Sequence, residues 1–244
     1  MSKRWKIGLP VAVLVVVLVV AGGVWWFFLR DDSPAAVDLD TASESVTPNT
    51  GGATSAPLTS VDGTWTVDNS SGEFDFESAT GTFAGFRIKE ELAGIGSTTA
   101  VGRTGDVTGT MSIEGTTLTA AQFDIDVSTI TTNESRRDDR VQEALETDQF
   151  PTATFTLTAP VDLGADPQSG QDLSVTATGD FTVHGVTRQV EVPLQARLVD
   201  DTIVVVGSFD VTFSDYGVSV PRAAIVLSVE DHGILELQLL LVKQ

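Results

Sequence analysis

Apolar and polar residues alternate with a period of two along most of the chain, and this pattern limits the possible fold more than any other feature. It is clearest between Gly179 and Leu194, where the alternation runs up to His184, breaks at Gly185 and resumes at Val186. Such alternation places successive side chains on opposite faces of an extended strand, and a glycine between two alternating runs is typical of a β-hairpin. The same pattern recurs at 63–67, 73–76, 107–113, 123–128, 153–157, 173–177, 203–213, 225–229 and 235–239, and the last two segments predict a final hairpin with its turn near 231–233.

These segments predict an all-β fold of about eight antiparallel strands. Each strand has one apolar face, so the sheet is expected to close into a barrel or a sandwich, and the length of the strands favours a barrel. One segment, 136–146, has good helix formers and apolar residues at helical spacing, which predicts a short helix across or at one end of the barrel. The glycines of 94–99 lack the spacing of a dinucleotide fingerprint, and we interpret this segment as a loop.

A barrel of this size either fills itself with side chains or holds one small ligand, and the sequence leaves both alternatives open. Small residues are frequent at inward positions, which favours a cavity. These positions are Gly109, Val175, Ala177, Gly179, Val205 and Gly207.

The composition excludes several classes of function. The chain has no cysteine, so it has no disulfide framework, cysteine nucleophile, zinc-thiolate site or lipid-modified cysteine. Its formal net charge is −20, which disfavours binding to nucleic acid. His184 and His232 are the only histidines and lie far apart, so we expect no metal site.

An apolar run at Ile7–Leu29 predicts one transmembrane helix within a segment 1–30. About 20 residues are needed to span a bilayer, and the run exceeds the roughly 7–15 residues of a signal-peptide core. Lysines and arginines precede it and aspartates follow it, so the positive-inside rule predicts a cytoplasmic N-terminus and an extracytoplasmic remainder at the cell membrane. Cleavage near 34–36 is the alternative.

Residues 31–60 are rich in Ser, Thr, Ala, Pro, Gly and Asp and contain no aromatic residue. Such a composition buries too little apolar surface to offset the entropy of ordering, so it predicts a flexible linker. The predicted β-domain therefore covers 61–244.

Few residues suggest chemistry. Arg136, Arg137 and Arg140, with Asp138 between them, form the one dense basic cluster of an acidic domain. An arginine at a barrel mouth would bind an anionic or polar ligand head, whereas the structural interpretation is an ion pair or a helix cap. His184, at a strand end, is interpreted as a hydrogen-bonded structural residue. We predict no catalytic residue, no metal ligand and no cofactor other than a bound lipid.

Four blocks resemble the YceI-like family, the polyisoprenoid-binding proteins with a lipocalin-like barrel. They are Asp126-Val-Ser-Thr-Ile-Thr-Thr132 followed by Arg137 and Asp138, then Phe150-Pro-Thr-Ala-Thr-Phe155, then Gly179-Asp-Phe-Thr-Val-His-Gly-Val-Thr-Arg188, and finally Asp215-Tyr-Gly-Val218. Their order and spacing fit the family over about 63–242. The stretch between Asp138 and Phe150 is shorter than in the family and lacks its Asp-Phe-Phe, so ligand access there differs.

The resemblance implies an extended antiparallel lipocalin-like barrel that holds an isoprenoid chain, of a quinone or a polyprenyl carrier, for transport, storage or protection. The expected cavity-lining residues are Phe74, Phe76, Phe86, Met111, Phe123, Ile125, Phe155, Leu157, Phe181, Val183, Val205, Phe209, Val211, Phe213 and Leu227; Arg137, Asp138 and His184 are expected at the mouth or in structural roles.

Two other functions stay open on the sequence alone. One is a structural or interaction barrel of the cell envelope that is filled with its own side chains. The other is an enzyme acting on the lipid head group, for which Arg137, Asp138 and His184 are the candidates. The identity of the lipid, the pathway served and the oligomeric state, a homodimer included, also stay open.

Overall fold

The structure, a computed structural model, describes residues 33–46, 60–70, 72–92, 96–164, 167–219 and 226–244, the side chains of Leu92, Val226 and Leu227 excepted. The predicted transmembrane helix and cytoplasmic N-terminus at 1–30 lie outside these residues. Within the described ranges, no helix has the length and apolar character needed to cross a membrane.

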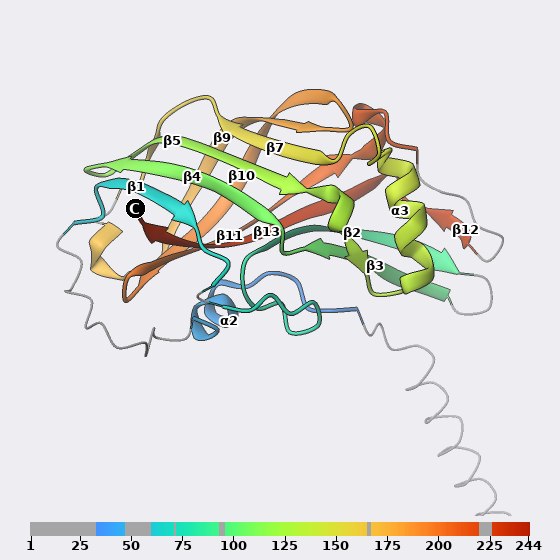
Figure 1. Cartoon of the computed structure of the whole chain (residues 1–244), viewed down its shortest axis with the longest axis horizontal. Coiled ribbons are helices and arrows are strands. Elements are labelled where there is room, and N and C mark those ends of the chain that lie inside the picture. The colour runs from blue at the N-terminus through green and yellow to red at the C-terminus, as the bar shows by residue number, and fades with distance from the viewer. Residues whose placement is uncertain (1–32, 47–59, 71, 93–95, 165–166, 220–225) are drawn as a thin grey trace, which may run out of the picture.

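Eight antiparallel strands form a closed barrel, which confirms the predicted all-β fold (Figure 1). In order around the barrel these are β1 (Gly63–Val67), β4 (Val107–Glu114), β5 (Thr117–Asp126), β7 (Thr152–Leu157), β9 (Leu173–Val183), β10 (Val186–Val199), β11 (Thr202–Thr212) and β13 (His232–Lys243). The ring closes where β1 pairs with the end of β13, with Trp65 opposite Lys243.

One side of the barrel is extended by strands that the alternation analysis did not identify. The first half of β13 pairs with β2 (Phe83–Leu92), which pairs with β3 (Gly96–Thr104), which in turn pairs with β6 (Thr131–Thr132). The interpretation of 94–99 as a loop is therefore wrong from Gly96 onward. Glu90 of β2 and Arg103 of β3 are charged residues that are buried in ion pairs, so polarity was a poor guide to exposure here.

The predicted helix is present at one end of the barrel, where η2 (Ser135–Arg137) leads into α3 (Asp138–Leu145). Its apolar Val141, Ala144 and Leu145 face the barrel interior, as their spacing predicted. Short helical turns η1 (Val127–Thr129), η3 (Pro167–Ser169) and η4 (Phe213–Tyr216) and the short strand β8 (Val161–Asp162) complete the domain.

The hairpin that the alternation predicted is formed by β9 and β10, with Val183 opposite Val186. Its two turn residues, His184 and Gly185, both have positive φ, at 53° and 71°. Two positive φ angles characterise the type I′ turn, whose twist matches that of the strands. The ring of Phe150 packs so closely on Gly185 that a side chain there would overlap it.

The predicted final hairpin is wrong. β12 (Val226–Val229) does not pair with β13; both pair with the same strand, β2, one after the other along its edge. The chain bends between them at Asp231, whose carboxylate accepts hydrogen bonds from the backbone N–H and the hydroxyl of Ser214. Apolar and polar residues alternate in the same way whether the two segments pair with each other or pair in succession with one neighbouring strand. Alternation therefore could not distinguish these two arrangements.

Part of the predicted linker is packed against the barrel. The helix α2 (Leu39–Glu44) starts at the N-cap Asp38 and buries Leu39 and Ala42 against Val204 and Leu240, on the outer face of β11 and β13. Leu39 and Ala42 therefore lie on one face of this short helix. We call the segment 33–46 the strap.

Candidate ligand cavity

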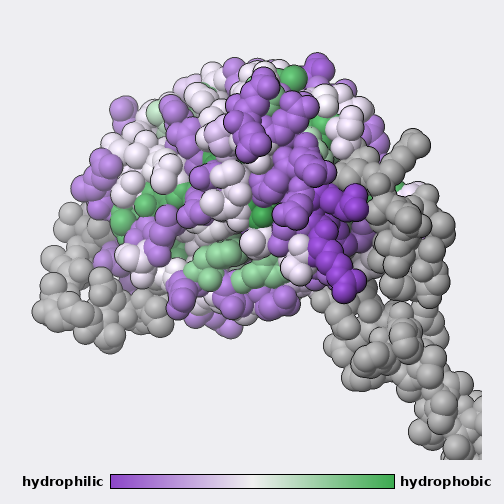
Figure 2. Space-filling model, turned by 45° about the vertical axis from the view of Figure 1, so that its right-hand side comes forward, coloured by the Kyte–Doolittle hydropathy of each residue, from purple (hydrophilic) through white to green (hydrophobic). Residues whose placement is uncertain are grey.

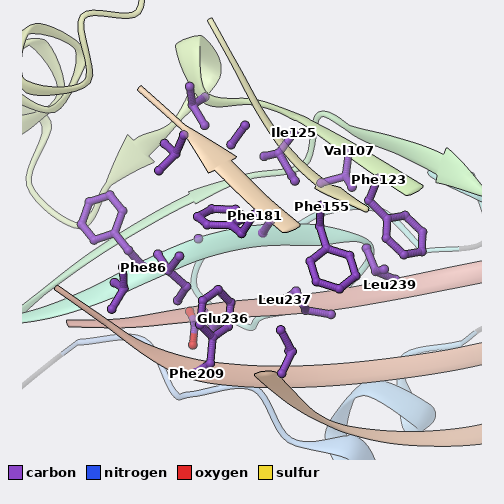
Figure 3. A pocket seen from close by; sticks show the side chains of 18 of the residues that line it. Phe86, Val107, Phe123, Ile125, Phe155, Phe181, Phe209, Glu236, Leu237 and Leu239 are labelled. Atoms are coloured by element: carbon purple, nitrogen blue, oxygen red, sulfur yellow. The ribbon is translucent and has the colours of Figure 1, made fainter. Parts of the chain in front are cut away.

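The barrel encloses a cavity of about 660 Å³. This lies within the range of about 300–1,000 Å³ that is usual for ligand sites. The walls are mostly apolar. They come from seven of the eight barrel strands, all but β1, and from β2, β3, β12, α3 and the four turns η1 to η4. In Figure 3 the side chains of Phe155, Phe181 and Phe209 point from opposite walls toward the common space.

The interior is hollow because several large side chains lie against the wall. The ring of Phe155 covers Gly179 on the neighbouring strand so closely that a Cβ there would overlap it, and Phe86 covers Gly102 in the same way. The glycines we expected to widen the cavity thus widen it indirectly, since they let aromatic rings lie flat. Phe123 and Phe155 remain partly accessible although they face inward, as expected for the lining of a hollow.

Most of the residues predicted to line the cavity do so. They are Phe86, Met111, Phe123, Ile125, Phe155, Leu157, Phe181, Val183, Val205, Phe209, Val211 and Phe213. The side chain of Leu227 lies outside the described residues. Ala84 and Ile88 on β2 also line the cavity and were not predicted to do so, although with Phe86 they alternate with Gly85 and Arg87 as inward-facing residues of a strand would.

Phe74 and Phe76 do not line the cavity, which corrects the prediction of a strand at 73–76. They belong to a loop that Asp75 ties together by accepting hydrogen bonds from the backbone and hydroxyl of Ser78. Phe74 packs on Phe83, with ring centroids 5.9 Å apart. Two apolar residues at alternate positions are too short a pattern to distinguish a strand from a loop.

Beneath this loop lies a buried ion pair that the sequence did not reveal. Arg103 is fully buried, and its Nε donates to Oε1 of Glu236 at 2.8 Å. Its other nitrogens donate to the carbonyls of Phe76 and of Ala35 in the strap. Gly85 lies between the two residues in the sheet register, and its lack of a side chain lets Arg103 cross β2.

The η2–α3 end of the cavity carries charged residues. Arg136, Arg137 and Arg140 border it together with Glu90 and Glu134. Arg137 forms a short ion pair with the buried carboxylate of Glu90 and donates to Oδ1 of Asn133 at 2.8 Å. The predicted mouth residue Arg137 is therefore at the mouth, and its guanidinium is occupied by protein partners.

Asp138 has a structural role at the start of α3. One of its carboxylate oxygens accepts hydrogen bonds from the backbone N–H of Thr132 at 2.8 Å and from the hydroxyl of Thr132 at 2.7 Å. Asp138 does not border the cavity. Its contacts fix the position of the helix relative to β6.

His184 lies at the opposite end of α3. Its Nδ1 is 3.0 Å from the carbonyl oxygen of Tyr216, and its Nε2 is 3.6 Å from the carboxylate of Glu146, the residue that ends the helix. A helix of this length spans about 12 Å, so His184 and Asp138 do not converge on one reacting atom. Nearby, burial raises the pKa of the Tyr216 phenol above its ordinary value, so this cavity-lining residue stays neutral.

At the other end of the cavity, the one charged residue in the lining is neutralised. Arg197 donates to Asp172 at 2.6 Å and to Asp40 of α2 at 2.7 Å. These hydrogen bonds raise the pKa of the Arg197 guanidinium and lower that of the Asp172 carboxyl. Over the described residues, no group of three or more potential metal ligands is found.

Comparison with known proteins identifies a family. Residues 39–240 match the YceI-like domain. A polyisoprenoid binding domain from Saccharophagus degradans, implicated in plant cell wall breakdown, superposes with a TM-score of 0.52 at 19% identity, covering 67% of this chain and 98% of its own. BcnA from Burkholderia cenocepacia superposes with a TM-score of 0.49 at 18% identity, covering 65% and 94%. These likenesses concern the fold. No curated protein matches the chain.

Proposed function

The chain belongs to the YceI-like family, and from this and the cavity geometry we propose that it is a non-catalytic binding protein for an isoprenoid lipid. The observation that carries the proposal is the hollow of about 660 Å³ inside a closed barrel, lined by apolar side chains from nearly every strand. The Saccharophagus domain, which is described as polyisoprenoid binding, shares this fold.

Burial of the hydrocarbon chain supplies the affinity in this proposal. Transfer of apolar surface out of water is favourable by about 25 cal/mol per Å². The inward faces of Phe123, Phe155 and Val175 keep accessible apolar surface inside the barrel, and an isoprenoid chain would cover it. The branched methyl groups of the chain suit a wall that alternates flat rings with aliphatic side chains.

We further propose that the barrel is extracytoplasmic and held at the membrane by a helix at 7–29. The sequence pattern of that segment supports this arrangement. Ser33 and Ala35 accept hydrogen bonds from Arg87 and Arg103 of the barrel, so a chain that left the membrane near residue 30 would reach the barrel within a few residues. Such a short connection would keep the barrel close to its lipid source.

The hollow interior favours lipid binding over the alternative of a barrel filled with its own side chains. The enzyme alternative has less support, because Asp138 and Arg137 are occupied by Thr132 and Glu90 and His184 lies at the other end of α3.

The test is native mass spectrometry of the full chain, stripped of copurifying lipid and incubated with geranylgeraniol or with the straight-chain alcohol of the same carbon number. We expect a geranylgeraniol complex that is at least about tenfold tighter, or about 1.4 kcal/mol. Val175→Phe, which adds a ring inside the cavity, should weaken binding about tenfold or more, whereas Thr176→Phe adds the same ring to the outer face and should not.

Binding of neither alcohol would refute the proposal. Preference for the straight chain would leave a lipid-binding barrel and refute the isoprenoid specificity. Equal effects of the two phenylalanine substitutions would show that the ligand is held elsewhere.

A further inference from the structure

The charges at the two ends of the cavity differ in a way that neither the fold nor the apolar lining requires. Arg197 at one end is bound by Asp172 and Asp40. At the η2–α3 end, Arg136 and Arg140 border the cavity, and in the described part of the chain neither side chain forms an ion pair.

The carboxylates near this end do not remove the imbalance. Glu90 is neutralised by Arg137. Glu236, also in the lining, is bound by Arg103. Glu134 is the third carboxylate in the lining, and it accepts a weak hydrogen bond from the backbone N–H of Arg136 at 3.5 Å. Within the lining at this end, two arginines without an ion pair therefore accompany one free carboxylate, while Glu143 and Glu146 lie on the side of Arg140 that faces away from the cavity, in a separate surface pocket.

This excess of positive charge is confined to the cavity lining, and it stands out in a chain with a net charge of −20. In Figure 2, turned so that the α3 end comes forward, strongly hydrophilic side chains lie beside hydrophobic ones on this face. An apolar space whose rim carries unpaired guanidinium groups is complementary to an amphiphile with a hydrocarbon tail and an anionic head, because guanidinium binds phosphate or carboxylate oxygens in pairs.

Resting on the proposed function, we propose that the ligand is an isoprenoid phosphate, and that Arg136 and Arg140 bind its phosphate at the η2–α3 mouth while the chain extends toward Arg197. The two arginines are then specificity residues, and they select the phosphorylated lipid over a neutral lipid with the same chain. Arg137 is a positioning residue for η2, because Glu90 and Asn133 occupy its guanidinium.

The experiment is a competition on the full chain, stripped of lipid, between equal concentrations of geranylgeranyl phosphate and geranylgeraniol, with bound species quantified by native mass spectrometry. We expect the phosphate to be favoured by about tenfold or more, a preference that falls as salt rises. The double variant Arg136→Gln/Arg140→Gln should bring the ratio to about one, because it removes the two guanidinium groups that bind the phosphate.

Lys243→Gln is the matched control. It removes one positive charge from an exposed residue that donates to the carbonyl of Ser60, far from the mouth, and it should keep the preference. Inorganic phosphate alone should give no complex, since burial of the hydrocarbon chain of the lipid supplies most of the affinity.

Equal binding of the two lipids would overturn the proposal, as would a preference that survives in the double variant. Binding of inorganic phosphate in the presence of geranylgeraniol would also overturn it, because the phosphate site would then be independent of the lipid. Failure of both lipids to bind would instead refute the proposed function, so the two failures are distinguishable.

Discussion

Single residues show how a very acidic chain places its few cations. Arg103 on β3 is buried with Glu236 on β13 and joins both strands to the strap, while Arg137 is paired with Glu90 at the mouth. Buried ion pairs add little net stability compared with apolar residues, but loss of one partner leaves a costly unpaired charge. Arg136 and Arg140, which border the η2–α3 end of the cavity, have no ion-pair partner among the described residues.

Arg103→Leu should lower the free energy of unfolding by about 3–5 kcal/mol, because Glu236 would remain buried without its main partner. Denaturant unfolding followed by circular dichroism measures the change. Arg188→Leu is the control, since Arg188 is exposed and donates to the carbonyl of Asp215. A loss as large in the control as in Arg103→Leu would contradict the assigned role.

At the scale of elements, two short helices define the functional geometry. α3 covers one end of the barrel, and its start and its end are held by Asp138 and by the contact of Glu146 with His184. α2 covers the outer faces of β11 and β13 and is held by its N-cap Asp38 and by the ion pair of Asp40 with Arg197. Both helices are shorter than an isolated helix that is stable in water, so packing and these polar contacts maintain them.

α2 should therefore loosen in acid before the barrel does. Hydrogen bonds from the backbone and side chain of Thr41 lower the pKa of the Asp38 carboxyl below its ordinary value of 3.8. A carboxyl whose pKa is lower in the folded state stabilises the fold above the unfolded pKa, and this contribution is lost as pH falls through the folded pKa. Amide hydrogen exchange should show loss of protection in 39–44 below about pH 3.8, before loss in β9 and β10.

Asp38→Asn is the matched variant, since asparagine caps a helix about as well as aspartate and does not titrate. Its α2 should keep protection to lower pH. Simultaneous loss of protection in α2 and in the barrel, in both proteins, would show that the cap is not the acid-sensitive group.

At the scale of the whole molecule, the strap makes the barrel and part of the preceding segment one folded unit. Its Leu39 and Val46 are buried on the outer face of the barrel, and its Ala35 carbonyl accepts from Arg103. Replacement of 33–46 by a Gly-Ser sequence of equal length should lower the free energy of unfolding by at least about 3 kcal/mol, at about 1.5–3 kcal/mol for each large apolar side chain.

The same replacement should expose Val204, Val206 and Leu240, so self-association is expected to increase. Denaturant unfolding and light scattering measure the two effects. Unchanged stability and unchanged particle size would show that the strap is dispensable and that the barrel alone is the folded unit.

The sequence determined the elements whose signal is local. Alternation identified most barrel strands, the turn at Gly185 and the inward position of Phe155, because each side chain of a strand reports its own face. The same reasoning failed for charged side chains that are buried by a partner from a distant part of the sequence. Glu90 of β2 becomes buried only when it pairs with Arg137, and Arg103 of β3 only when it pairs with Glu236 of β13. The strap lacked enough apolar residues to indicate packing on its own.

The tertiary structure alone decided whether the barrel is hollow. Volume inside a barrel depends on which side chains meet across strands distant in sequence, such as Phe155 over Gly179, and no local pattern records that meeting. The tertiary structure also decided which arginines form ion pairs, because pairing depends on whether the fold places a carboxylate beside the guanidinium group. The sequence thus determined a barrel with a basic cluster, and the fold placed Arg136 and Arg140, unpaired, at the mouth of an apolar cavity.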